Sequence, residues 1–339
     1  MKGIDINIFS EIKQVCDSVN NIVIISHRNP DGDAIGSALG LYHVLNNMNK
    51  NATVIIPNDY PEFLRWLPGN ESVIRFDNNK EFATEIIKNA ELLFFLDFND
   101  LSRISGVDEV VRDLKTPKVL IDHHPDPSDF TDFNVSTIDV SSTAELIFEF
   151  VSTCQMTHHI DKNSAECLFT GLLTDTVSFS VNAYRPSTFR TTGALLEKGI
   201  NFDDIRNKVF NNYSEERTRL LGHCLLNKMV VMPESKAAYI VISTKDVYKF
   251  KFAKGDSEGF VNYPLSMKNI TFSALFIEKK DHVKISFRSK EKVPVNEFAK
   301  LHFNGGGHLN AAGGEYFSTI DETVKKFEAL LPEFMKKYV

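Results

Sequence analysis

Three apolar segments of this chain each run into acidic or imidazole side chains. They span residues 22–25, 91–96 and 118–121, and short runs of this kind bounded by turn residues indicate buried parallel strands. The carboxyl ends of parallel strands meet at one edge of a sheet, and open α/β sheets bind ligands there. We therefore expect one sheet edge to collect the side chains that follow these segments. They are His27, Asp31, Asp33, Asp97, Asp122, His123 and His124.

Carboxylates gathered at one edge repel one another and raise each other's pKa unless a cation lies between them. Asp175, after a helix expected at residues 163–173, adds one more carboxylate. Oxygen ligands with imidazoles suit manganese or magnesium better than a thiolate zinc site, and imidazole favours manganese. Two such ions can activate a water and clamp a phosphoryl oxygen, so we expect phosphate ester hydrolysis. The candidate ligands are His27, Asp31, Asp33, Asp97, His123 and Asp175.

A plainer alternative exists for the first of these loops. Asp31 and Asp33 precede a helix that we expect to begin near Ala34, and aspartate is a common helix N-cap. A similar choice applies to residues 141–145 (SSTAE), which have the form of a helix start. That segment either caps its helix or contributes to phosphate binding or to the support of a metal ligand.

Composition restricts the class of protein. The chain has 339 residues, enough for two domains, with 42% hydrophobic residues and 27 Phe. A formal charge of −7 argues against binding of long duplex nucleic acid, which needs a broad basic surface. The 4 cysteines form no CxxC pair, so we expect neither disulfides nor a zinc ribbon. Since no signal peptide or membrane-length apolar run is visible, we expect a soluble cytoplasmic protein.

The order of segments predicts an α/β fold. Strands and helices alternate as far as residue 139, which indicates a doubly wound, mainly parallel sheet. Helices follow, and strands return from about residue 230 with a hairpin at 270–288, then a glycine-rich segment and a last helix at 321–337. We expect a catalytic domain at 1–190, a helical connector at 191–229 and a smaller α+β domain at 230–339, with the active site in the cleft between the domains.

Several residues outside the acidic edge are candidate anion contacts. The segment Gly305, Gly306, Gly307 and His308 combines backbone N–H groups that an anion can approach with an imidazole donor. Arg288, at the end of the hairpin, offers a bidentate guanidinium, and Arg103 follows Asp97 closely. The alternatives are a structural glycine turn, an exposed strand-end arginine and a surface salt bridge.

These motifs resemble those of the DHH phosphoesterases. Residues 26–37, Asp97, the Asp122-His123-His124 triplet and Thr174-Asp175 match four motifs of that family in order, and residues 304–313 resemble the glycine-rich signature of its associated C-terminal domain. The resemblance implies that His27, Asp31 and Asp97 bind one ion and that Asp33, Asp97, His123 and Asp175 bind the other. It also implies that Asp122 orients a metal ligand and that His124 faces the scissile phosphate, where it stabilises charge or protonates the leaving oxygen.

Length makes the chain most similar to the nanoRNase and pAp phosphatase subgroup. The resemblance implies a manganese-dependent phosphodiesterase, with Mg²⁺ or Co²⁺ as substitutes, that cleaves RNA of about two to five nucleotides to mononucleotides and acts also on pAp. A linear or cyclic dinucleotide phosphodiesterase (pApA, pGpG, cyclic di-AMP) stays open, as does a homodimer. A catalytically silent nucleotide-binding module is the remaining alternative. We expect no membrane partner.

Overall fold

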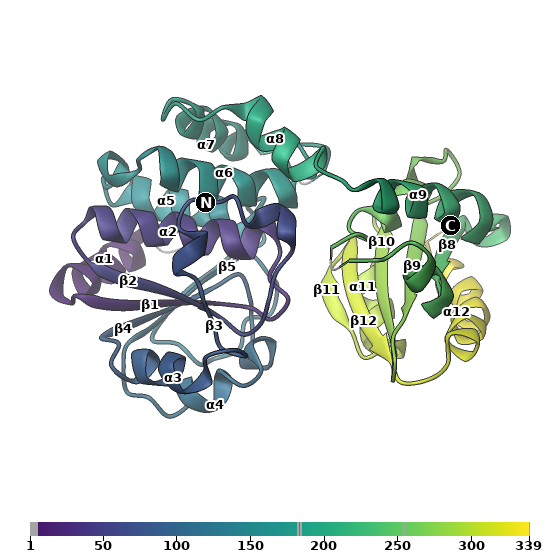
Figure 1. The fold of residues 1–339 in the computed structure, drawn as a ribbon, viewed down its shortest axis with the longest axis horizontal. Coiled ribbons are helices and arrows are strands. Elements are labelled where there is room, and N and C mark those ends of the chain that lie inside the picture. The colour runs from purple at the N-terminus through teal and green to yellow at the C-terminus, as the bar shows by residue number, and fades with distance from the viewer. Residues whose placement is uncertain (1–5, 182, 184, 254, 339) are drawn as a thin grey trace. The chain divides into compact units, whose positions relative to one another are not determined.

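The computed structural model describes residues 6–181, 183, 185–253 and 255–338 (Figure 1). The chain divides into an N-terminal unit, Met1–Asn212, and a C-terminal unit, Tyr213–Val339. Each unit has its own sheet and its own buried clusters of apolar side chains. No helix in the described part of the chain combines the length and the apolar character needed to cross a lipid bilayer.

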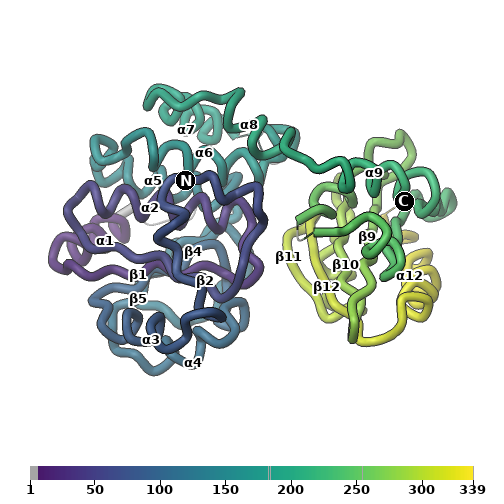
Figure 2. Tube along the Cα trace, viewed as in Figure 1, coloured from purple at the N-terminus to yellow at the C-terminus, as the bar shows by residue number. Residues whose placement is uncertain are grey.

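The N-terminal sheet is wholly parallel and doubly wound, as predicted. Its strand order is β3-β2-β1-β4-β5-β6, so the chain moves outward from β1 in one direction, returns to β4 beside β1, and continues in the other (Figure 2). Ligand sites of such sheets lie at the carboxyl ends of the strands where the order reverses, here between β1 and β4. The strands are β1 (Asn21–Ser26), β2 (Asn51–Ile56), β3 (Ile74–Arg75), β4 (Leu92–Leu96), β5 (Lys118–Asp122) and β6 (Phe133–Ser136).

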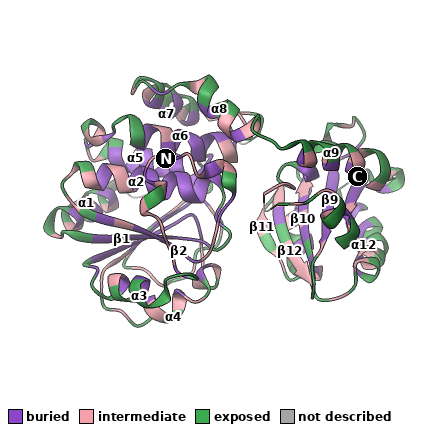
Figure 3. Cartoon of the chain, in the orientation of Figure 1, coloured by how far each residue is buried: buried purple, intermediate pink, exposed green. Residues whose placement is uncertain are grey.

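Helices cover both faces of this sheet (Figure 1). Alternate strand residues point to opposite faces, so Ile22 and Ile24 of β1 pack with helices α2, α5 and α6, whereas Val23 and Ile25 pack in a second cluster with α3 and α4. Burial on both faces explains why these strands are continuously apolar (Figure 3). The helices are α1 (Ile6–Ser18), α2 (Gly32–Asn47), α3 (Lys80–Lys88), α4 (Asp108–Val111), α5 (Thr143–Thr153), α6 (Lys162–Asp175), α7 (Pro186–Leu196) and α8 (Phe202–Phe210).

The C-terminal unit is built on a mixed sheet with the order β11-β12-β10-β9-β8-β7, in which only β8 and β9 run parallel. Phe272, Phe287, Phe298 and Phe327 form its aromatic centre between the sheet and α11 and α12. The strands are β7 (Met229–Met232), β8 (Ala237–Ile242), β9 (Phe272–Glu278), β10 (Val283–Ser289), β11 (Gly306–His308) and β12 (Ala311–Tyr316). The helices are α9 (Glu215–His223), α10 (Thr244–Lys249), α11 (Val295–His302) and α12 (Ile320–Met335).

The structure adds elements that the sequence did not predict. β6 is a short edge strand with only one fully buried residue, Val135, so it lacks a clear apolar pattern. The glycine-rich segment, expected as a turn, forms strand β11 and the first half of β12. Residues 191–229 are shared by the two units, since α8 lies in the N-terminal unit and α9 in the C-terminal one. The domain boundaries that we expect from the sequence (1–190, 191–229 and 230–339) remain a prediction.

Candidate metal centre

The loop after β1 supplies the first candidate ligands. Asp31 is the N-cap of α2, and its carboxylate accepts hydrogen bonds from the N–H groups of Asp33 and Ala34 at 3.2 and 3.1 Å. His27 is buried, and its Nδ1 donates to the carbonyl oxygen of Arg28 at 2.8 Å, because a carbonyl can only accept. In the neutral ring the lone pair is therefore on Nε2, which lies 3.9 Å from Asp31 Oδ1. Of the two aspartates that the plainer alternative assigned to capping, Asp31 is the cap and Asp33 lies in the first turn of α2. Capping leaves the Asp31 carboxylate beside a nitrogen that can bind a metal.

Asp97 occupies the centre of the candidate site. It follows β4 with a φ of 69° and is 2% exposed. Its Oδ2 lies 3.4 Å from His27 Nε2, and its Oδ1 lies 3.4 Å from His123 Nε2. The two oxygens of one carboxylate thus face two different imidazoles, as a bridging ligand would require.

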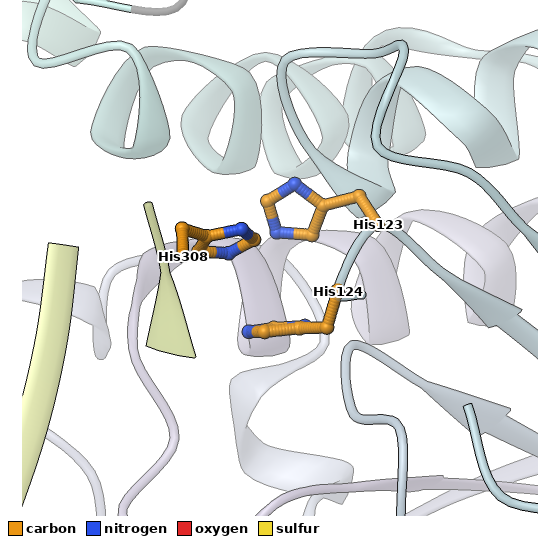
Figure 4. A group of neighbouring side chains, drawn as sticks. All are labelled: His123, His124 and His308. Carbon is orange, nitrogen blue, oxygen red and sulfur yellow. The ribbon is translucent and has the colours of Figure 1, made fainter. Parts of the chain in front are cut away.

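The segment after β5 contributes two imidazoles with different surroundings (Figure 4). His123 is buried, and its Nε2 lies 3.7 Å from Asp33 Oδ2 and 3.3 Å from Asp175 Oδ2. His124 Nδ1 lies 2.7 Å from Asp122 Oδ1, with the two histidine ring centroids 4.9 Å apart. We expected Asp122 to orient a metal-binding imidazole. Its carboxylate lies against His124, the imidazole that we expect at the phosphate, and its role in orienting a metal ligand stays a prediction.

Close packing of two helices brings Asp175 to this edge. A Cβ atom on Gly36 of α2 would lie 2.6 Å from the carbonyl oxygen of Cys167, and one on Gly171 of α6 would lie 2.8 Å from Asp33 Oδ1. Only glycine permits so small a separation between these helices. The last residue of α6, Asp175, therefore lies at the start of α2.

Six predicted ligands form two groups. In each group, one donor atom per residue lies within 4.8 Å of the others. Five of these residues are buried or half-buried and Asp31 is exposed, and such a set of nitrogen and oxygen donors suits a hard divalent cation. The first group is His27, Asp31 and Asp97, and the second is Asp33, His123 and Asp175.

The charges of this cluster are strongly coupled. Burial, together with the charges of Asp97 and Asp175, holds the pKa of Asp33 well above its usual value. Burial acts in the same direction on Asp97, but hydrogen bonds from His123 and His27, the latter in its protonated form, outweigh it and hold the pKa of Asp97 well below its usual value. The pKa of His123 is raised, because its hydrogen bond to Asp97 and the charge of Asp175 outweigh burial. A divalent cation would relieve the repulsion among these carboxylates, so the residues present fit such an ion.

Two further contacts of the cluster come from the start of α5. The Thr143 hydroxyl donates to Asp97 Oδ1 at 2.9 Å, and the Thr143 N–H donates to Asp33 Oδ2 at 2.6 Å. Ser142 is the N-cap of α5, so both interpretations of residues 141–145, a cap and a support for metal ligands, apply. Thr143 is absent from the residues predicted for the site. The helix-start pattern was its only signal in the sequence.

Arg103 lies on the same side of the N-terminal unit. The 3-10 turn that carries it, Leu101–Ile104, is joined to the loop after β1 by a hydrogen bond from the Arg28 N–H to the Arg103 carbonyl oxygen, 2.7 Å long. The Nε atom of Arg103 is buried and has no hydrogen-bond partner among the residues described. Burial and the positive charge of Arg103 lower the pKa of His27, but the hydrogen bond to Asp97 and the charges of Asp31 and Asp97 outweigh them, so this pKa is raised above its usual value.

The remaining predicted residues lie together in the C-terminal unit. Arg288 of β10 and His308 of β11 are each paired with Ala311 of β12. Residues paired in this way point to the same face of a sheet, so a small side chain separates the guanidinium from the imidazole. The neighbouring Phe287 points to the opposite face, into the aromatic core. Arg288 and His308 therefore lie on the face of the sheet opposite to Phe287.

The glycines beside His308 have different roles. A Cβ atom on Gly305 would lie 2.1 Å from the Gly313 carbonyl oxygen, and one on Gly307, whose φ is 141°, would lie 2.5 Å from the Ala311 carbonyl oxygen. These two positions need glycine because strands approach closely. At Gly306 a Cβ atom would meet nothing within 4 Å, so steric crowding does not require glycine at this position.

The chain is similar in sequence to curated proteins and to a solved structure. Two curated relatives are named bifunctional oligoribonuclease and PAP phosphatase NrnA, the first with the prefix "probable". The Streptococcus mutans protein is 26% identical over 92% of this chain and 95% of its own, and the Thermus thermophilus protein is 29% identical over 86% and 83%. A solved structure, described as an exopolyphosphatase-related protein from Bacteroides fragilis, is 43% identical, with a TM-score of 0.95 over 99% of both chains.

Two family matches cover most of the chain. Residues 21–172 match the N-terminal domain of the DHH family and include the predicted ligands from His27 to His123, and residues 235–337 match the DHHA1 domain and include Arg288 and His308. The candidate ligands from His27 to His123 and the candidate anion contacts Arg288 and His308 thus lie in regions that match these family models. The chain belongs to the DHH family of phosphoesterases and carries a DHHA1 domain.

Proposed function

We propose that this protein is a manganese-dependent phosphodiesterase that cleaves RNA of about two to five nucleotides to mononucleotides and also acts on pAp. One observation carries the proposal. Asp97, buried and held at a positive φ, directs its two carboxylate oxygens toward imidazoles of two ligand groups. That arrangement suits two ions that share one bridging carboxylate.

The ligands divide between two ions as the two groups suggest. His27, Asp31 and Asp97 would hold one ion, and Asp33, Asp97, His123 and Asp175 would hold the other. Bound there, a pair of Mn²⁺ ions supplies an activated water and neutralises charge on the phosphate. The protein's part would be to fix the ligand atoms in place before the ions bind, by holding them at the ends of β1, β4, β5 and α6 and at the start of α2.

His124 and Asp122 would complete the chemistry. Hydrogen bonding of Nδ1 to the buried Asp122 carboxylate fixes the orientation of the His124 ring. An imidazole held in this way beside the cluster would stabilise negative charge on the phosphate or donate a proton to the leaving oxygen. Arg103 would add a second positive charge for the same phosphate.

Support for a short nucleotide substrate comes from the C-terminal unit and from the relatives. Arg288 and His308 share one sheet face, where a guanidinium and an imidazole can bind a phosphate that is not cleaved. Two relatives bear the names oligoribonuclease and PAP phosphatase. The solved relative that is 43% identical is named for its relation to exopolyphosphatases, so polyphosphate is the competing substrate.

A substrate panel tests the proposal. Purified protein is incubated with Mn²⁺ or Mg²⁺ and with pAp, pApA, cyclic di-AMP, a five-nucleotide RNA or polyphosphate, and the products are separated by chromatography. We expect mononucleotides from pApA and the short RNA, AMP and phosphate from pAp, and faster rates with Mn²⁺. Removal of metal by EDTA should abolish these activities. Turnover of polyphosphate or cyclic di-AMP alone would contradict the proposed substrate class.

A further inference from the structure

We propose that the start of helix α5 is a positioning device for the metal centre, in which Thr143 holds two ligands and the buried carboxylate of Glu145 holds Thr143. The inference rests on the proposed metal centre. It adds residues that touch neither substrate nor metal and that act through Asp33 and Asp97.

Thr143 and its neighbour fix both carboxylates with direct hydrogen bonds. The N–H groups of Thr143 and Ala144 donate to the two oxygens of Asp33 at 2.6 and 2.9 Å, and the Thr143 hydroxyl donates to Asp97 Oδ1 at 2.9 Å. Hydrogen bonds to a charged carboxylate are short and strong, and each oxygen keeps a second lone pair for a cation. The ligand oxygens are therefore held in one orientation before any ion binds.

Glu145 keeps this helix start in place. Its Oε2 accepts three hydrogen bonds, from the Ser141 N–H at 2.9 Å, the Ser141 hydroxyl at 2.5 Å and the Thr188 hydroxyl at 2.9 Å. Its own N–H donates to the Ser142 hydroxyl at 3.1 Å. The Glu145 carboxylate thus links Ser141, which precedes Thr143, to Thr188 of α7. Movement of Thr143 away from Asp33 and Asp97 would break this network.

The burial of Glu145 exceeds what a simple helix cap needs. The residue is 0% exposed, and its Oε1 is buried with no hydrogen-bond partner in the described part of the chain. A buried carboxylate is costly even when several donors surround it, whereas a capping glutamate at the surface avoids that cost. What the buried carboxylate does in the structure is to fix the geometry of residues 141–144.

Removal of the Thr143 hydroxyl alone gives the sharpest test. Thr143→Val keeps the backbone and the branched shape, and Thr143→Ser restores the hydroxyl. Titration of metal-free full-length protein with Mn²⁺ alone, followed by calorimetry and electron paramagnetic resonance, measures affinity and the coupling between ions. We expect Mn²⁺ affinity to fall about 10- to 100-fold in Thr143→Val, with a weaker spin coupling, and to return to within about threefold of wild type in Thr143→Ser.

A matched control separates positioning from general stability. Thr323 in α12 is also 0% exposed, and its hydroxyl donates to the Thr319 carbonyl oxygen at 2.7 Å, away from any candidate ligand. Thr323→Val should bind Mn²⁺ like wild type even if its melting temperature falls. If Thr143→Val behaves in the same way, with unchanged Mn²⁺ affinity, the inference is overturned while the metal centre stands.

Two milder variants test the second step should Thr143→Val fold poorly. Glu145→Gln removes the charge that the three donors share, and Thr188→Val removes one of those donors. We expect both to weaken Mn²⁺ binding, by about tenfold and about threefold, without loss of far-ultraviolet circular dichroism. A fall in melting temperature with unchanged Mn²⁺ affinity in both variants would overturn the role of Glu145. If wild-type protein binds no Mn²⁺, the proposed metal centre is itself wrong and the inference falls with it.

Discussion

Asp97 combines a strained backbone conformation with a buried carboxylate in the candidate metal centre. A φ of 69° is uncommon for a residue with a side chain, and glycine would adopt it at lower cost. Aspartate tolerates the left-handed region better than bulky residues do, yet it retains a carboxylate there that is almost wholly buried. Strained backbone of this kind concentrates at functional sites, where the surrounding structure holds it in place.

Replacement of Asp97 should therefore remove activity without unfolding the protein. In Asp97→Ala we expect turnover of pApA to fall by several orders of magnitude, because metal binding and charge neutralisation are lost together. Asp97→Asn keeps the shape and tolerates the positive φ, so it controls for backbone effects. Steady-state kinetics with Mn²⁺ measure the loss, and more than about a tenth of wild-type kcat/KM in Asp97→Ala would show that the bridge is assigned to the wrong residue.

Asp246 in the C-terminal unit provides a prediction about pH and stability. Burial would raise its pKa, but hydrogen bonds from Ser243 and an ion pair with Lys228, 3.0 Å away, lower the pKa to about 2. A lowered pKa in the folded state stabilises the protein above the usual value near 3.8, and this contribution disappears as the pH falls from about 4 to about 2.

Denaturant unfolding of wild type and Asp246→Asn at several pH values tests this contribution. The shift corresponds to about 2 kcal/mol at neutral pH. The variant should be less stable by that order at pH 7, and the difference should shrink below pH 4. Asp113→Asn, at an exposed position, is the control and should change little. A difference between wild type and Asp246→Asn that stays constant from pH 7 to pH 3 would contradict the assignment.

At the scale of elements, the pair of helices α2 and α6 positions a ligand. Glycines on both helices let the backbones approach, and this contact places the last residue of α6 beside the first turn of α2. A methyl group at the contact would move whole helices, since the atoms that it would meet belong to the backbone.

Gly36→Ala should thus affect stability and metal binding together. The new Cβ would lie 2.6 Å from the Cys167 carbonyl oxygen and 2.7 Å from the Gly171 nitrogen. We expect a loss of about 1 to 3 kcal/mol in stability, typical of overpacking, and weaker Mn²⁺ binding because Asp175 moves. Gly193→Ala in α7, where a Cβ meets nothing within 4 Å, is the matched control and should keep or raise the melting temperature. Equal effects of the two substitutions would refute this role of the helix contact.

Arg288 of β10 and His308 of β11, which are both paired with Ala311 of β12, lead to a prediction about substrate binding. Arg288→Ala and His308→Ala should each lower kcat/KM for pApA and pAp about ten- to a hundredfold, the cost of one charge-assisted hydrogen bond, while Mn²⁺ binding stays near wild type. A small ester such as bis-p-nitrophenyl phosphate has no nucleotide to hold, so its cleavage should change much less. Equal losses on both substrates would show that these residues serve the fold or the metal centre instead.

At the scale of the whole molecule, charge limits the length of the substrate. The chain carries a net charge of −7, so it offers no extended basic track for a long RNA. We expect rates to fall as RNA grows beyond about five nucleotides. Initial rates on pApA, a five-nucleotide RNA and a 24-nucleotide RNA at equal concentration of ends measure this dependence. Comparable rates on the longest and the shortest substrate would disprove the preference.

The position of the metal-binding edge could be predicted because its signals are local. An apolar strand and the acidic residue that follows it are neighbours along the chain, and parallel strands necessarily bring such ends together. For this reason the doubly wound sheet and the gathering of His27, Asp97 and His123 at one edge of it could be inferred before the fold was known, whereas the family was inferred from the order of the motifs. For Asp175 the sequence indicated only its place at the end of an expected helix, and the packing of α6 against α2 brings it to this edge.

The supporting contacts could not be predicted in this way. Thr143 lies 110 residues from Asp33 and 46 from Asp97, and their hydrogen bonds depend on how α5 packs against the sheet. Asp122 contacts His124 because of side-chain orientation, which no sequence pattern encodes. The glycines of β11 and β12 similarly gave no strand signal, since they are needed only where two backbones meet. These features arise from long-range packing and side-chain geometry, which exist only once the chain has folded.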